Sequence, residues 1–133
     1  MLRIYRILIN IIYFFSPIII LIRILNKKED ITRFKEKLCF FSKKRSKGRL
    51  VWFHASSVGE VLSIIPLIEK LEKSKNINKI LITTNTLSSS KVILEKKNLK
   101  KVIHQFFPID TNSLSRKFLN HWKPDIAMFV ESE

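Results

Sequence analysis

Cysteine, glycine and acidic side chains are all scarce in this chain of 133 residues. It has one cysteine, two glycines and 11 acidic residues against 25 basic ones. The single cysteine, Cys39, excludes an intramolecular disulfide, and no Cys/His spacing indicates a zinc site. With glycine only at Gly48 and Gly59, the chain has neither a Walker A pattern nor a G-x-G-x-x-G loop. We therefore expect no metal and no cofactor, in a reducing compartment that faces the cytosol.

The shortage of acidic residues gives a net charge of +14, which is unevenly spread. Residues 1–50 carry 13 basic and 3 acidic side chains, whereas residues 51–133 carry 12 and 8. The excess therefore belongs mainly to the first 50 residues. An anionic membrane surface explains it better than a nucleic acid does, because the basic residues lie beside an apolar segment and do not interleave with stacking aromatics. We predict a membrane partner and no nucleic acid.

One long apolar run, residues 7–22, is interrupted only by Asn10, Ser16 and Pro17. As a helix it would reach roughly 24 Å, slightly less than the hydrocarbon core of about 30 Å. A secretory signal and an ordinary buried helix are the alternatives, but no small-residue cleavage site follows the run. Lys and Arg are more numerous after the run than before it, so we expect the following residues on the cytoplasmic side.

The remaining residues alternate between apolar strand patterns and helical patterns. We expect strands over residues 50–55, 79–84 and 101–108 and from about 125, with helices over about 58–74, 89–97 and 111–122. Pro66 should kink the first of these helices or open one of its hydrogen bonds. This helix carries one apolar stripe of Val61, Leu62, Ile65, Ile68 and Leu71. Alternation at these lengths predicts an α/β fold with a parallel, Rossmann-like sheet.

This pattern divides the chain into three expected parts. Residues 1–26 form a membrane-anchor helix, residues 27–48 a basic membrane-proximal segment, and residues 49–133 the Rossmann-like domain. A sheet that stopped at residue 133 would have a bare edge, so we expect the chain to be the front portion of a longer protein.

Two glutamates are the main candidates for chemistry, because ligands of parallel sheets bind beyond the carboxyl ends of the strands. Glu60 completes an S-x-x-E capping box with Ser57, which is the structural alternative to a catalytic role. Gly59 would let a substrate approach the backbone, and the Glu60 carboxylate could then accept a proton from its hydroxyl. Glu131 and Glu133 share one face of the last strand, and Glu131 could approach Glu60 and raise its pKa.

Several polar residues follow the other strands. Thr84, Thr86 and Ser88 lie after the second strand, and Asp110 precedes a helix. Each has an ordinary interpretation as a loop or capping group, but all are expected at the same rim of the sheet. His54 ends an apolar strand, and we expect it to be a buried histidine with satisfied hydrogen bonds.

The segments WFHASSVGEV, ITTNTLSSS, HQFFPID, RKFLNHWKPD and FVESE, in this order, resemble the N-terminal half of the 3-deoxy-D-manno-oct-2-ulosonic acid (Kdo) transferases of lipopolysaccharide synthesis. The resemblance implies an inverting GT-B glycosyltransferase with two Rossmann-like domains and no metal in the active site. It implies transfer of Kdo from CMP-Kdo to the lipid A precursor at the cytoplasmic face of the bacterial inner membrane. The N-terminal domain would receive the lipid acceptor, and the C-terminal domain would bind CMP-Kdo.

The same resemblance assigns site residues. Glu60 falls on the general base of the S-x-G-E motif, and Glu131 on the first glutamate of the E-x-E-L-W-P motif. Ser57, Gly59, Thr84, Thr86, Ser88 and Asp110 become candidate substrate-binding residues.

The chain departs from the family pattern at several positions. Ser88 and Ser89 stand where the family usually has Thr and Gly, and Lys37 and Cys39 stand where it has Arg and Gly in E-R-x-G. Family members also continue past E-S-E into a donor domain, so we expect this chain alone to be inactive. A non-catalytic membrane-associated remnant, or a lipid-binding scaffold, is the alternative function.

Overall fold

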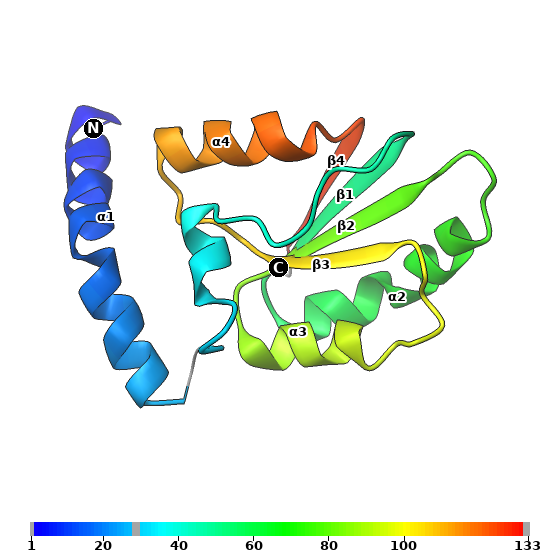
Figure 1. Cartoon of the computed structure of the whole chain (residues 1–133), viewed down its shortest axis with the longest axis horizontal. Coiled ribbons are helices and arrows are strands. Elements are labelled where there is room, and N and C mark those ends of the chain that lie inside the picture. Colours follow the sequence, from blue (N-terminus) through cyan, green and yellow to red (C-terminus); the bar gives the residue numbers. More distant parts are fainter. Residues whose placement is uncertain (1, 28–29, 132–133) are drawn as a thin grey trace.

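The computed structural model describes residues 2–27 and 30–131 and contains a four-stranded parallel sheet with helices on both faces (Figure 1). Ser132 and Glu133 lie outside the described residues, and with them the prediction for Glu133. The predicted α/β class is confirmed. The strands are β1 (Leu50–Ala55), β2 (Lys79–Thr84), β3 (Val102–Phe106) and β4 (Ile126–Val130), and the sheet order is β3-β2-β1-β4.

A helix joins each strand to the next one along the chain, and two further helices precede β1. The helices are α1 (Leu2–Leu25), α2 (Val58–Glu72), α3 (Leu87–Leu94) and α4 (Asn112–Trp122), with a short 3-10 helix, η1 (Phe34–Leu38). In Figure 1, α2 and α3 cover one face of the sheet and α4 covers the other. The central strand β1 pairs with β2 on one side and with β4 on the other, and its carboxyl end, Ala55, lies opposite Val130.

Alternation along β1 supplies both halves of the core. Val51, Phe53 and Ala55 pack under α2 together with Ile80 and Ile82 of β2. Leu50 and Trp52 point to the opposite face, where they pack with residues of α4 such as Phe118 and Trp122. Since both faces of β1 and β2 are covered, the middle of each strand is continuously apolar, as expected of a buried parallel sheet, and polar residues stand only near the strand ends.

Three details of the sequence prediction are wrong. The α3 helix spans Leu87–Leu94 instead of residues 89–97, because Thr86 acts as its N-cap and its side chain accepts a hydrogen bond from Ser89 N. Leu62 is 54% exposed and is not part of the buried stripe of α2, which contains Ile64 in its place. The third strand is shorter than predicted and ends at Phe106.

Helix α1 is long and apolar enough to cross a bilayer, with 24 residues and a mean hydropathy of 2.3 over its best 18-residue window. Only Ser16 and Ile20 on it are buried against the rest of the chain. Pro17 lies inside the continuous helix, as Pro66 does in α2. Most of the apolar surface of α1 therefore faces outward.

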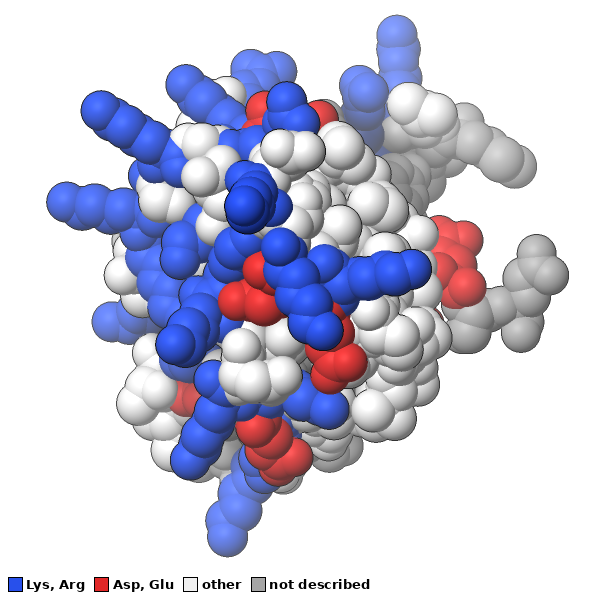
Figure 2. Space-filling model, turned by 90° about the vertical axis from the view of Figure 1, so that its right-hand side faces the viewer, with Lys and Arg blue, Asp and Glu red and all other residues white. Residues whose placement is uncertain are grey.

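Basic side chains gather at the amino ends of the strands, on the face turned to the viewer in Figure 2. The basic residues that precede or begin the strands are here called the lysine face. They include Lys73, Lys75, Lys79, Lys96, Lys97, Lys100, Lys101 and Lys123, together with Arg49. Most of them come from the half of the chain with the smaller net charge. The fold thus concentrates a charge that is dispersed along the sequence.

Candidate active site

Glu60 and Glu131 line one open hollow at the carboxyl ends of β1 and β4. Its volume is about 320 Å³, and its other lining residues are His54, Ser56, Phe129 and Val130. Because β1 and β4 are parallel neighbours, the residues that follow them meet at the same edge. The predicted approach of Glu131 to Glu60 is thus matched by the fold.

The carboxylate of Glu60 is held at the first turn of α2. Its Oε2 accepts hydrogen bonds from the backbone N–H of Ser56 at 2.6 Å and of Ser57 at 3.4 Å, while Ser57 Oγ accepts one from Glu60 N at 3.2 Å. The predicted capping box is confirmed. The positive end of the helix dipole favours a negative charge at this position. The side chain is only half-buried, so one carboxylate serves as a cap and also lines the hollow.

Gly59 precedes Glu60 and is exposed. A Cβ placed on Gly59 would have nothing within 4 Å, so the packing of the described chain does not require glycine there. The absent side chain leaves the amino end of α2 open to an approaching molecule.

His54 lies behind the hollow and joins two strands. Its Nδ1 shares a hydrogen bond with Thr83 Oγ1 at 3.0 Å, and its Nε2 shares one with Ser56 Oγ at 3.1 Å. Trp52 Nε1 donates to the same Thr83 oxygen at 2.9 Å. Burial lowers the pKa of His54, partly offset by the Thr83 hydrogen bond and the charge of Glu60. The imidazole is therefore neutral near pH 7, and the prediction of a buried, satisfied histidine is confirmed.

The loop after β2 and the first turn of α3 contribute through Asn85 and Ser89, which were not predicted as site residues. Asn85 Nδ2 donates to Ser56 Oγ at 3.1 Å, and Ser89 Oγ donates to the Ser56 carbonyl at 3.2 Å. Together they fix the backbone that presents Glu60. The available signal for Asn85 was its position directly after the carboxyl end of β2. Ser89, in the first turn of α3, had no signal beyond its place in a polar run.

Thr84, Thr86 and Ser88, the site residues predicted after β2, do not line the hollow. Thr84 is fully buried and shares a hydrogen bond with His104 Nε2 at 2.9 Å. Thr86 caps α3 and shares a hydrogen bond with Ser89 Oγ at 2.7 Å, whereas Ser88 is exposed on the first turn. None of the three is among the lining residues of the hollow.

Asp110 lies away from the hollow, next to α1. Its Oδ2 accepts a hydrogen bond from the Tyr5 hydroxyl at 3.1 Å. Its interpretation as a helix cap is wrong, because α4 begins at Asn112 and Thr111 accepts the capping hydrogen bond from Leu114 N at 3.2 Å. Across the described ranges, 2–27 and 30–131, no group of three or more His, Cys, Asp and Glu side chains could hold a metal ion.

Comparison with known proteins identifies the family. Residues 32–133 match the family model described as "3-Deoxy-D-manno-octulosonic-acid transferase (kdotransferase)". The 3-deoxy-D-manno-octulosonic acid transferase of Rickettsia bellii is 42% identical over 122 residues, which cover 92% of this chain and 28% of that protein. The probable mitochondrial 3-deoxy-D-manno-octulosonic acid transferase of Arabidopsis thaliana is 38% identical over 133 residues, 98% of this chain and 30% of that protein.

More distant relatives also match. The 3-deoxy-D-manno-octulosonic acid transferase of Haemophilus influenzae is 29% identical over 83 residues, 62% of this chain and 19% of that protein. No solved structure matches. The chain thus spans less than a third of the length of the relatives from Rickettsia bellii and Arabidopsis thaliana.

A parallel sheet with helices on both faces, preceded by an apolar helix, fits the N-terminal half of a GT-B glycosyltransferase. The chain belongs to the 3-deoxy-D-manno-octulosonic acid (Kdo) transferase family.

Proposed function

We propose that this chain forms the acceptor-binding half of an enzyme that transfers Kdo from CMP-Kdo to the lipid A precursor. The observation that carries the proposal is the shared hollow of Glu60 and Glu131, next to the open helix end at Gly59. The donor, CMP-Kdo, would be bound mainly by a C-terminal domain, in the part of the relatives that this chain does not cover. We expect no metal and no cofactor to take part.

In the proposed reaction, an acceptor hydroxyl donates its proton to the Glu60 carboxylate. The hydroxyl oxygen forms a bond to the anomeric carbon of Kdo while the bond from that carbon to the CMP phosphate oxygen breaks, and CMP leaves with the electron pair. Attack opposite to the leaving group inverts the anomeric centre. A carboxylate held by two backbone N–H groups is already oriented before the acceptor arrives, which is an arrangement that favours general-base catalysis.

The remaining candidate residues have supporting roles in this proposal. Glu131, across the hollow, would position the acceptor or the developing charge. Ser57, Thr86 and Ser88 lie at or beside the helix ends that face the sheet edge and would bind polar groups of the substrate, as would Asp110 at its more distant position. Helix α1 and the cytoplasmic, anionic face of the inner membrane would keep the domain near its lipid acceptor.

The first prediction uses a chimera in which residues 1–133 replace the matching segment of the Rickettsia bellii relative. Glu60→Gln should reduce Kdo transfer about 10²- to 10⁴-fold, the usual contribution of a general base. Gln can still complete a capping box, so the thermal midpoint should change little. Transfer from CMP-Kdo to the lipid A precursor is measured by mass spectrometry of the product.

The matched control is Glu69→Gln on the same helix. Glu69 is outside the hollow and lies 3.8 Å from Lys96 at the surface, so transfer should be unchanged. Transfer at the unsubstituted rate by the Glu60→Gln chimera would remove the base role. A folded, unsubstituted chimera that binds the lipid acceptor and transfers no Kdo would favour the alternative of a lipid-binding scaffold.

A further inference from the structure

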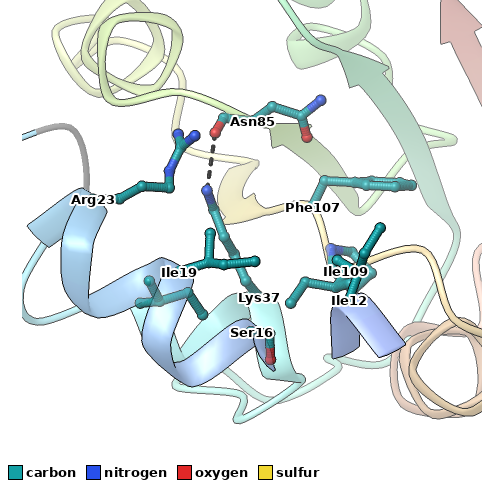
Figure 3. A pocket seen from close by; sticks show the side chains of 10 residues that line it. Ile12, Ser16, Ile19, Arg23, Lys37, Asn85, Phe107 and Ile109 are labelled. Carbon is teal, nitrogen blue, oxygen red and sulfur yellow. Dashed lines mark hydrogen bonds between the residues drawn. The ribbon is translucent and has the colours of Figure 1, made fainter. Parts of the chain in front are cut away.

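A groove separates α1 from the α/β domain and lies apart from the Glu60 hollow (Figure 3). Its volume is about 280 Å³, near the lower end of small-molecule sites, which are about 300 Å³ or more. Ile12 and Ile19 of α1 form one wall, and Phe107 and Ile109 form the other. It shares no lining residue with the hollow.

One end of this groove is cationic. Lys37 Nζ donates a hydrogen bond to the Asn85 carbonyl at 3.2 Å, and the half-buried Arg23 lines the same groove. In Figure 3 the charged ends of Arg23 and Lys37 both extend toward Asn85, whereas the isoleucine side chains occupy the opposite part. The groove is therefore amphipathic along its length.

Ser16, also on the wall of the groove, has an unsatisfied hydroxyl. The residue is only 3% exposed, and within the described part of the chain its Oγ has no hydrogen-bond partner. A serine in a helix usually donates to a carbonyl of the preceding turn. Ser16 precedes Arg23 by seven residues, a rise of roughly 10 Å, so an acceptor for it would lie further along the groove toward Ile12 than a group bound at Arg23.

The position of α1 indicates what occupies the groove. Tyr5 near one end of the helix donates to Asp110, and Arg23 near the other end borders the groove, so α1 lies along the domain. Exposed polar residues such as Asp110 and Asn112 cannot lie in hydrocarbon at acceptable cost. A membrane-bound chain in this arrangement would place α1 in the interface plane, at the depth of lipid headgroups, with its apolar outer face toward the acyl chains.

We propose that this groove binds one anionic glycerophospholipid of the bilayer. Its phosphate lies between Arg23 and Lys37, its glycerol lies beside Ile19, an ester carbonyl accepts a hydrogen bond from Ser16, and an acyl chain runs from there past Ile12. Phosphate oxygens with basic partners form charge-assisted hydrogen bonds. The lipid joins α1 to the domain and orients the domain at the membrane surface, independently of any catalytic role for Glu60.

The test is native mass spectrometry of the 133-residue chain released from nanodiscs of equal parts phosphatidylglycerol and phosphatidylcholine. We expect one retained phosphatidylglycerol, favoured over phosphatidylcholine at least tenfold. Arg23→Gln with Lys37→Gln should abolish this preference. Lys44→Gln with Lys47→Gln, an equal change of charge at exposed positions outside the groove, should leave it intact.

A second variant tests the proposal by filling the groove. Ser16→Phe places a ring in the groove without changing the charge and should abolish retention of both lipids, with helical content by circular dichroism as the folding control. If the double glutamine variant does not fold, Ser16→Phe decides alone. Equal retention of the two lipids by the unsubstituted chain, an unchanged preference for phosphatidylglycerol in the double glutamine variant, lipid retention by Ser16→Phe, or an equal loss of preference in the Lys44/Lys47 control would overturn the proposal. Displacement of phosphatidylglycerol by an equimolar lipid A precursor would also overturn it, because the groove would then be an acceptor site.

Discussion

The two ends of the sheet are built from different kinds of interaction. At the carboxyl ends, side chains from several segments share buried hydrogen bonds, such as those joining His54 to Thr83 and Ser56. At the amino ends, the lysine face consists mostly of exposed side chains (Figure 2). The same four strands thus end in a fixed polar network on one side and in a solvated charged surface on the other. Substitutions should therefore have large effects at the first end and small ones at the second.

The largest effect on stability is expected for Glu36→Ala. The buried Glu36 carboxylate accepts two hydrogen bonds from Arg33 at 2.9 Å and one from Phe106 N, at the carboxyl end of β3, at 3.0 Å. Its removal leaves the buried Phe106 N–H without its acceptor and the Arg33 guanidinium without its carboxylate, with one hydrogen bond to the His104 carbonyl remaining. This should cost roughly 3 to 5 kcal/mol in the free energy of unfolding. Urea denaturation of the full chain in detergent measures this. A loss below about 1 kcal/mol would show that the pair contributes little.

The second largest effect is a loss of stability in acid, caused by His104 on β3. Burial, with smaller contributions from Arg33 and Lys43, lowers its pKa to about 3. The unfolded state, with a pKa near 6.5, binds the proton first, so stability falls as the pH falls below 6.5. The expected loss between pH 7 and pH 5 is about 2 kcal/mol. His54, whose pKa is also lowered by burial, contributes with the same sign.

Urea denaturation at several pH values, for the unsubstituted chain and for His104→Gln, measures this effect. The variant should show a smaller decrease between pH 7 and pH 5, because Gln does not titrate. Parallel curves for the two proteins would exclude His104 as a source of acid sensitivity.

At the amino ends of the strands, a substitution that relieves backbone strain should change stability more than one that removes a charge. Lys123, the C-cap of α4, has a left-handed conformation with φ of 42°, and Pro124 follows it. Lys123→Gly should therefore stabilise the fold by about 0.5 to 1 kcal/mol. Lys73→Gly is the matched control, since the α2 C-cap has φ of −81° and should gain nothing. Thermal unfolding compares the two, and equal shifts would contradict the explanation.

The smallest effect is expected for Lys97→Gln combined with Lys100→Gln on the lysine face. The backbone N–H of Lys100 donates to Glu72 Oε1 at 2.8 Å, and this hydrogen bond survives the substitution. The free energy of unfolding should change by less than about 0.5 kcal/mol. A change as large as that of Glu36→Ala would mean that the two ends of the sheet do not differ as described.

The sequence predicted the elements that have continuous apolar patterns. The bounds of β1 and β2 are as predicted, because both strands are buried on both faces and are limited by polar residues. The start of α3 was missed because the Thr86 cap lies within a polar run that is equally typical of a loop. Leu62 was wrongly predicted to be buried, because a 3.6-residue period does not determine which residues at the border of an apolar stripe are buried.

The site was predictable where its interactions are local. The capping box of Ser57 and Glu60 spans three residues and has a sequence signature. The support of Ser56 by Asn85 and Ser89 joins residues about 30 positions apart and has none. The contact of Tyr5 with Asp110 spans 105 positions and depends on how α1 docks, which no local pattern determines.

Trp52 gives this protein a built-in optical reporter. The chain has two tryptophans, both buried, and the Trp52 indole donates to the same Thr83 oxygen that contacts His54. Its ring also lies 5.1 Å from that of Phe129, a lining residue of the hollow. Binding events at the carboxylates should therefore change the ultraviolet emission of the unlabelled chain, without any dye or tag.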